Sequence, residues 1–231
     1  LVVKYLLFTK VGSVVFKLNF KGGFMKFGYF CNTTNWTHKP YHQLLDETKE
    51  ITEYCDKNKW NSIWFTEHHF NHEGMESCTN PLMLGADAAA RTKNIRIGQA
   101  ANVITFHNPI RLAEDIATLD QLSKGRVEVG VARGVYGREA INLNKEADLK
   151  DQAKNFRLFA ETLEILKKAW SEKFFNHDGE FYTYPSPNYV WQHDMSPPNE
   201  EFMNMEDSTM KKISVVPVSY THLTLPTTMW V

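Results

Sequence analysis

The stretch Ser62–Asn71, SIWFTEHHFN, decides the fold. Its first five residues, Ser62–Thr66, are rich in β-branched and aromatic side chains, which is typical of a strand buried on both faces. Glu67, His68 and His69 follow directly. In sheets wound with helices, ligands bind where the carboxyl ends of the strands meet. The stretch therefore predicts a buried strand that leads into a candidate site, although paired histidines can also simply close a loop through hydrogen bonds.

Strand and helix patterns alternate around this stretch. Further apolar runs predict strands at Lys26–Phe30, Ile95–Ala101 and Arg126–Val131. Helical spacing of apolar residues, with Asn-Pro pairs at two of the starts, predicts helices at Tyr41–Lys57, Pro81–Arg91, Pro109–Ser123 and around Phe156–Trp170. Four strands separated by helices indicate βα units and a parallel sheet. We expect an α/β fold of the (β/α)8 TIM-barrel family, here an incomplete barrel with about four parallel strands.

The chain divides into four segments by composition. Residues 1–24 contain no acidic residue, and residues 217–231 continue no βα unit, so we expect a non-native leader and a non-native tail. A genuine edge strand is the alternative for the first of these. Residues 25–173 then form the N-terminal half of a barrel, and residues 174–216 form an inserted excursion that begins with a hairpin. We expect this excursion to act as a lid; the alternative is an irregular surface loop.

The composition narrows the classes of partner. The chain has 231 residues, of which 42% are hydrophobic and 23% charged, and a formal net charge of −1. This balance excludes the broad basic field that nucleic acids or anionic membranes require, so we expect a small-molecule substrate. Three widely spaced cysteines predict neither a disulfide framework nor a paired-cysteine zinc site. We expect a cytoplasmic protein without a membrane span.

Small residues and one arginine follow the third and fourth strands. Ala100, Ala101 and Ala132 would let a flat ring approach the backbone closely, and Arg133 offers a planar fork for a phosphate group. A histidine such as His68 exchanges protons near working pH. Together these residues predict a flat, phosphorylated cofactor and a reaction that needs proton transfer.

Strand alternation predicts one buried ion pair. If Ala100 and Ala132 face the barrel interior, Arg96 and Glu128 face it as well, on neighbouring strands, whereas the isoleucines and valines between them pack against helices. Unpaired buried charges are costly, so we predict that Arg96 and Glu128 bind each other.

Five motifs resemble the bacterial luciferase-like flavin-dependent monooxygenases. They are MKFGYF, SIWFTEHHFN, IGQAANVI, NPIRLAEDIATLDQLSKGR and VGVARGVYGRE, in the family's order across Met25–Trp170. The resemblance implies a TIM barrel that uses dioxygen and reduced FMN, supplied by a flavin reductase, to oxidise a small apolar substrate such as an aldehyde. It also implies a homo- or heterodimer. Ala132 replaces a cysteine of the light-emitting α chain, so the resemblance favours the wider monooxygenase family over luminescence.

The resemblance also assigns roles. It implies that His68 is catalytic, as an acid or base in the oxygen chemistry of the flavin, and we place Glu67 and Tyr136 with it. The substrate side would carry His69, Glu139 and His107. The cofactor would lie against Ala100, Ala101 and Ala132, with a cis peptide between the first two and with Arg133 on its phosphate.

Three alternatives remain open. One is a deazaflavin (F420) dependent hydride-transfer enzyme of the same fold, and another is a non-catalytic flavin-binding or subunit-like protein. The third is a metal site of His68, His69, His72 and Cys78, which the absence of an H-E-x-x-H motif disfavours. An incomplete barrel would lack part of the pocket wall, so we expect weak activity or none from this chain by itself.

Overall fold

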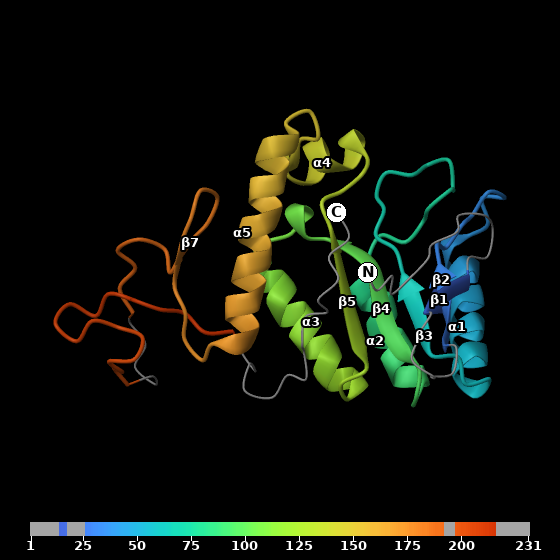
Figure 1. Ribbon diagram of the computed structural model, residues 1–231, viewed down its shortest axis with the longest axis horizontal. Helices are drawn as coiled ribbons and strands as arrows, with labels where there is room; N and C mark the ends of the chain where they lie inside the picture. Colours follow the sequence, from blue (N-terminus) through green and yellow to red (C-terminus); the bar gives the residue numbers. More distant parts are fainter. Residues whose placement is uncertain (1–13, 18–25, 192–196, 216–231) are drawn as a thin grey trace.

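Four parallel strands form the centre of the structure. The computed structural model describes residues 14–17, 26–191 and 197–215. Strands β2 (Lys26–Cys31), β3 (Ser62–Phe65), β4 (Arg96–Val103) and β5 (Val127–Ala132) lie side by side in chain order, each parallel to the next (Figure 1). This confirms the predicted βα units of a partial TIM barrel.

A fifth strand lies at one edge of the sheet. Strand β1 (Val14–Lys17) pairs antiparallel with β2, with Val14 opposite Tyr29. It falls within residues 1–24, for which we weighed an edge strand against a non-native leader. The rest of that segment and the expected tail, residues 217–231, lie outside the described residues.

Helices α1 (Tyr41–Lys57), α2 (Pro81–Arg91), α3 (Pro109–Ser123) and α5 (Gln152–Ser171) occupy the predicted ranges. Side-chain caps fix the N-termini of α2 and α3. The Asn80 side chain accepts the N–H of Met83, and the Asn108 side chain accepts the N–H groups of Ile110 and Arg111, which caps α2 and α3. Proline follows each cap at a position where its missing N–H costs nothing.

Residues of β5, and those of β4 up to Gln99, alternate between the two faces of the sheet as predicted; between Gln99 and Asn102 the register of β4 shifts. Ile97, Val129 and their outward-facing neighbours are buried in the core against the helices. On the other face, the guanidinium of Arg96 donates a hydrogen bond to Glu128 and a second one to the carbonyl of Val127, at 3.0 Å. The predicted pairing is therefore confirmed, but its predicted burial is wrong, since the side chains of Arg96 and Glu128 are 37% and 26% exposed.

Two aromatic residues of these helices are exposed. Tyr54 of α1 is 61% exposed, because the buried stripe runs through Leu44, Thr48, Thr52 and Cys55 and turns away from it. Phe156 of α5 is 48% exposed, because its ring lies at the rim of the sheet beneath the guanidinium of Arg133, 5.8 Å from ring centre to carbon. The second finding places the start of α5 beside the candidate site.

Three short helices were not predicted. The 3₁₀ helix η1 (Ile104–Phe106) follows β4, whereas α4 (Gly137–Leu143) and η2 (Lys145–Ala147) follow β5. In Figure 1, α4 lies above the carboxyl ends of the strands. These helices therefore contribute to the surroundings of the site.

The predicted hairpin after α5 is present as β6 (His177–Asp178) and β7 (Thr183–Tyr184). The Glu161 carboxylate of α5 binds it by accepting the N–H groups of Glu180, Phe181 and Tyr182 at 2.9–3.2 Å. Figure 1 shows this segment beside α5, on the side away from the sheet. In this view the described residues of the segment do not lie over the strand ends, and the lid stays a prediction.

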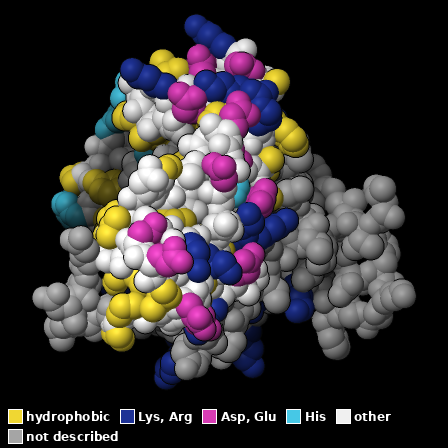
Figure 2. Space-filling model, turned by 90° about the vertical axis from the view of Figure 1, so that its left-hand side faces the viewer, with side chains coloured by type: hydrophobic (Ala, Val, Ile, Leu, Met, Phe, Trp, Pro, Cys, Tyr) yellow, Lys and Arg dark blue, Asp and Glu magenta, His cyan; other side chains and the backbone are white. Residues whose placement is uncertain are grey.

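Charges of both signs alternate on this side of the molecule. Figure 2 shows Lys and Arg next to Asp and Glu over α5 and the hairpin, and pairs such as Arg157–Glu180 join the two elements. In the described residues, no helix combines the length and apolar character needed to cross a bilayer. Cys31, Cys55 and Cys78 are free and buried.

Candidate active site

The carboxyl ends of β3, β4 and β5 form one edge. In the sheet register, Phe65 of β3 pairs with Gln99 of β4, and Val103 of β4 pairs with Ala132 of β5. Buried polar atoms without a hydrogen-bond partner among the described residues gather at this edge: Asn32 Oδ1, Thr33 Oγ1, Thr66 Oγ1, His68 Nδ1, Asn71 Oδ1, Gln99 Nε2, Asn102 Oδ1, Arg138 Nε and Glu139 Oε2. Most buried polar groups in proteins are paired, so this concentration marks a candidate site.

The carboxylate of Glu67 joins β3 to β4. It is 2% exposed, and it accepts the N–H of Val103 at 2.7 Å. Its other oxygen lies 2.7 Å from Nε2 of His107 and 3.1 Å from Nε2 of His69. Burial by itself would raise the pKa of Glu67, but the bonds to His107 and His69, the charge of His107 and the Val103 N–H outweigh it, so the pKa is lowered.

The pKa of His107 shifts in the opposite direction, upward. Burial would lower the pKa of its imidazole, but the hydrogen bond and the charge of Glu67, with Asp115 nearby, raise it overall. Each shift favours the charged form of its group, so Glu67 and His107 form an ion pair whenever His107 is protonated. Among the described residues, the hydrogen-bond partners of the Glu67 carboxylate belong to β4 or to the connections that follow β3 and β4, which suits a positioning residue.

His68 faces other neighbours. Its backbone N–H donates to the carbonyl of Cys78 at 2.8 Å. Its ring has Nδ1 3.5 Å from Oε1 of Glu139 and Nε2 3.4 Å from Oε1 of Glu76. These are ion-pair separations and not aligned hydrogen bonds, since Nδ1 has no hydrogen-bond partner. The Tyr136 ring lies 5.5 Å away between ring centres. An imidazole so placed can hold and release a proton.

Glu139 is fully buried at the start of α4. Its Oε1 accepts the backbone N–H of His69 at 2.7 Å, which ties α4 to the strand end of β3. Its Oε2 has no partner among the described residues. The predicted site residues His68, Glu139 and Tyr136 are therefore together, whereas Glu67, His69 and His107 form a separate group beside them.

Small residues form the inner face of β4 and β5 at the same edge. Ala100, Ala101 and Ala132 are partly exposed, and the peptide between Ala100 and Ala101 is cis, as the resemblance predicted. Earlier in β4, Gly98 lies so close to the ring of Trp64 that a Cβ on residue 98 would be 2.2 Å from a ring carbon. This face is flat enough for a ring system to lie against the backbone.

Arg133 lies at the end of this face. Its backbone carbonyl accepts hydrogen bonds from Oγ1 of Thr105 at 3.0 Å and Nδ2 of Asn155 at 3.3 Å, which fixes the chain. Its guanidinium donates to Oε1 of Gln152 at 3.3 Å and lies over Phe156. In the part of the chain that is described, no carboxylate pairs with it, so its charge suits a phosphate.

Two acidic residues of the site were missed from the sequence. Glu73 forms a two-pronged ion pair with Arg138, at 2.8 and 3.3 Å, and this hydrogen bonding lowers the pKa of Glu73 to about 2. Glu76 contacts His68 as described above. The acids of HEGMESC are visible in the sequence, but only the return of the loop at Gly74, with φ of 78°, shows that they reach the site.

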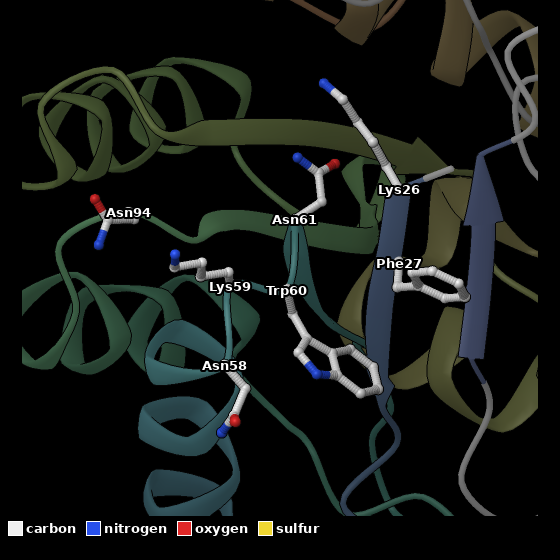
Figure 3. A pocket seen from close by; sticks show the side chains of 7 residues that line it. All are labelled: Lys26, Phe27, Asn58, Lys59, Trp60, Asn61 and Asn94. Atoms are coloured by element: carbon white, nitrogen blue, oxygen red, sulfur yellow. The ribbon is translucent and has the colours of Figure 1, made fainter. Parts of the chain in front are cut away.

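A hollow of about 720 Å³ lies at the opposite end of the strands. Figure 3 shows its lining side chains, which spread apart instead of converging: Lys26, Phe27, Asn58, Lys59, Trp60, Asn61 and Asn94. It contains no imidazole and no carboxylate. Because active sites of parallel sheets lie at the carboxyl ends, we do not place the chemistry there.

Similar proteins share this fold. The chain is 35% identical over 162 residues to the alkanal monooxygenase beta chain of Photorhabdus laumondii, covering 70% of this chain and 48% of that protein. It is 33% identical over 143 residues to the oxygenase component of flavin-dependent trigonelline monooxygenase of Acinetobacter baylyi, covering 62% and 38%. The oxygenating constituent of 3,6-diketocamphane monooxygenase from Pseudomonas putida, solved with FMN, superposes with a TM-score of 0.61 at 24% identity, covering 67% and 42%.

The chain thus spans about half the length, or less, of the curated relatives it matches. Residues 25–198 match the sequence model of a protein family described as "Luciferase-like monooxygenase". This match covers most of the described residues and all four parallel strands. The chain belongs to the luciferase-like monooxygenase family.

Proposed function

We propose that this protein is a flavin-dependent monooxygenase that uses reduced FMN and dioxygen to oxidise a small apolar substrate such as an aldehyde. The observation that carries the proposal is the position of His68 between two carboxylates, at the carboxyl ends of the parallel strands. Ala100, Ala101, Ala132 and Arg133 lie at the same ends. Membership of the luciferase-like family supports it. When bound, reduced flavin supplies two electrons, so that one oxygen atom enters the substrate and the other leaves as water.

The residues of this chain have separate tasks in this proposal. Arg133 binds the phosphate, and Ala100, Ala101 and Ala132 admit the flat ring. His68 holds or moves a proton at its imidazole, with Tyr136 and Glu139 around it. Glu67, with His69 and His107, positions the strand ends that carry these groups.

The phosphate role of Arg133 is tested by comparing FMN with riboflavin, which lacks the phosphate. In fluorescence titrations, Arg133→Ala should weaken FMN binding about 10- to 100-fold, because charged hydrogen bonds contribute about 1.5–3 kcal/mol, and it should leave riboflavin binding unchanged. Arg157→Ala is the matched control, since Arg157 pairs with Glu180 on the outer side of α5. Equal losses for both ligands would refute the phosphate role.

The catalytic role of His68 is tested by single substitution. His68→Ala should abolish oxygenated product from a series of aliphatic aldehydes and should spare FMN binding. His72→Ala is the control, because the side chain of this nearby histidine is 87% exposed. Unchanged turnover in His68→Ala would remove the assignment.

A separate reductase is the third element of the proposal. One relative is the oxygenase component of a flavin-dependent monooxygenase, a name that indicates a system of more than one component. Turnover with NADH should therefore require an added flavin reductase, and chemically reduced FMN should replace it. Turnover with reduced F420 in place of reduced FMN would favour the deazaflavin alternative.

A further inference from the structure

The loop after β3 turns back toward the site. The N–H of Gly74 donates to the carbonyl of Asn71 at 3.2 Å, and the carbonyl of Gly74 accepts the N–H of Asn35 at 2.6 Å. Gly74 has a φ of 78°, and a Cβ there would lie 2.2 Å from the Asn35 carbonyl oxygen. Only glycine fits this turn without strain. The loop is therefore held closed, and its last residues return to His68.

This return places Glu76 against the imidazole of His68. Oε1 of Glu76 lies 3.4 Å from Nε2 of His68, and its other oxygen accepts a hydrogen bond from Nδ2 of Asn71 at 3.5 Å. The side chains of Glu76 and His68 are 17% and 15% exposed. Water therefore screens their interaction only in part.

The hydroxyl of Tyr136 is the second partner of Glu76. Burial, followed by a hydrogen bond to Glu76 and the negative charges of Glu76 and Glu139, raises the pKa of this phenol. Tyr136 thus remains a neutral hydroxyl that donates to the carboxylate. Glu76 therefore joins the tyrosine to the histidine.

Two carboxylates from different elements lie beside the imidazole of His68. Glu76 belongs to the loop after β3, and Glu139 approaches Nδ1 from α4. The cation of Arg138 lies 5.5 Å from the Tyr136 ring, but it is paired with Glu73. The net environment of the imidazole is negative on both of its nitrogen atoms.

We propose that Glu76 is a positioning residue of this site, which together with Glu139 fixes the orientation of the His68 imidazole beside Tyr136. This inference rests on the proposed function for the use of that imidazole. Glu76 itself acts through His68 and need not contact a substrate.

NMR of the whole chain with labelled histidine tests the proposal without turnover. The ring resonances of His68 are assigned by their loss in His68→Gln, and their chemical shifts at one fixed pH are compared between the unmodified chain and Glu76→Gln. We expect these resonances to move in Glu76→Gln, because the imidazole loses the carboxylate that lies 3.4 Å from its Nε2. Glu73→Gln is the control in the same loop, and it should leave the His68 resonances in place. Unchanged His68 resonances in Glu76→Gln overturn the proposal.

A conservative variant separates charge from structure. Glu76→Asp retains the carboxylate and should keep the His68 resonances closer to those of the unmodified chain than Glu76→Gln does; a change as large as that in Glu76→Gln overturns the proposal. This variant also serves if Glu76→Gln does not fold. In turnover assays, Glu76→Gln should lower kcat and leave FMN binding unchanged, and Glu76→Asp should restore part of the loss. If His68→Ala turns over normally, the proposed function fails while the NMR result still decides the role of Glu76.

Discussion

Replacing Glu67 by glutamine should destabilise the protein in a pH-dependent way. The amide keeps the shape of the side chain and one acceptor oxygen for the N–H of Val103, but it removes the charge that His107 and His69 share. The lost stability should therefore depend on whether His107 is protonated. The expected effect is largest where both members of the pair are charged.

The pKa shifts define that pH window. The pKa of Glu67 is lowered, so its contribution to stability is present above its ordinary value of 4.5 and is lost as pH falls through the lowered value. The pKa of His107 is raised, so its contribution is present below its ordinary value of 6.5 and is lost as pH rises through the raised value. The pair is fully formed between these two ordinary values.

The size of the effect follows from the number of bonds. Hydrogen bonds to charged groups contribute about 1.5–3 kcal/mol each, against about 1 kcal/mol for neutral ones. The side chain of His107 is 37% exposed, so water screens its share and we take the lower end. Glu67→Gln should therefore cost about 2 kcal/mol near pH 5.5, which lowers Tm by roughly 4–8 °C. Near pH 9, about half of this loss should remain.

Thermal unfolding followed by circular dichroism from pH 5 to pH 9 measures this effect. The double-mutant cycle of Glu67→Gln and His107→Gln isolates the pair, and its coupling should be about 1 kcal/mol near pH 5.5 and fade by pH 9. A control cycle of Glu67→Gln with Glu73→Gln should show no coupling, since Glu73 contacts Arg138. Tm curves of Glu67→Gln and the unmodified chain that stay parallel over the whole range would refute the reasoning.

Three further predictions follow from the sheet and its core. Gly98→Ala should lower the free energy of unfolding in urea by about 1–3 kcal/mol, because the added Cβ meets the ring of Trp64. Adding Trp64→Leu should recover part of this loss, and an unchanged urea midpoint in Gly98→Ala would contradict the prediction. Glu128→Gln should lower the free energy of unfolding by at most about 1 kcal/mol, and by less in high salt, since the pair with Arg96 is partly exposed. A loss that does not depend on salt would contradict an ionic interaction. Burial, with a smaller effect of Cys31, raises the pKa of Cys55 to about 11, so a thiol reagent at pH 8 should label this residue only after denaturant is added; immediate labelling would disprove its burial.

The scaffold could be predicted from the sequence because its signals are local. Asn80 and Asn108 cap the helices that they were expected to cap, and each precedes a proline. Strand alternation predicted the pairing of Arg96 with Glu128 because a period of two places them on one face. Each of these inferences needs only a few neighbouring residues.

The rest of the site depends on how distant segments meet. Glu76 reaches His68 only because the loop turns at Gly74, which is held by Asn35 from the end of β2. No periodic pattern records such a contact. Phe156 is a related case, because its helical spacing suggests a core position, whereas the guanidinium of Arg133 covers it at the rim. Sequence patterns thus give the edge at which the site lies, and tertiary contacts select the residues that act together.

The three adjacent residues Glu67, His68 and His69 show how this selection works. Side chains that leave a strand alternate in direction, so the first and third point the same way and bind each other at 3.1 Å, while the second points elsewhere. The first and third join β3 to β4 through Val103 and His107 and contribute to stability. The second is left between two carboxylates with a proton to give or receive. A rigid strand end and the histidine proposed for proton transfer therefore come from the same three residues, and substitutions at Glu67 should change stability first whereas those at His68 should change chemistry first.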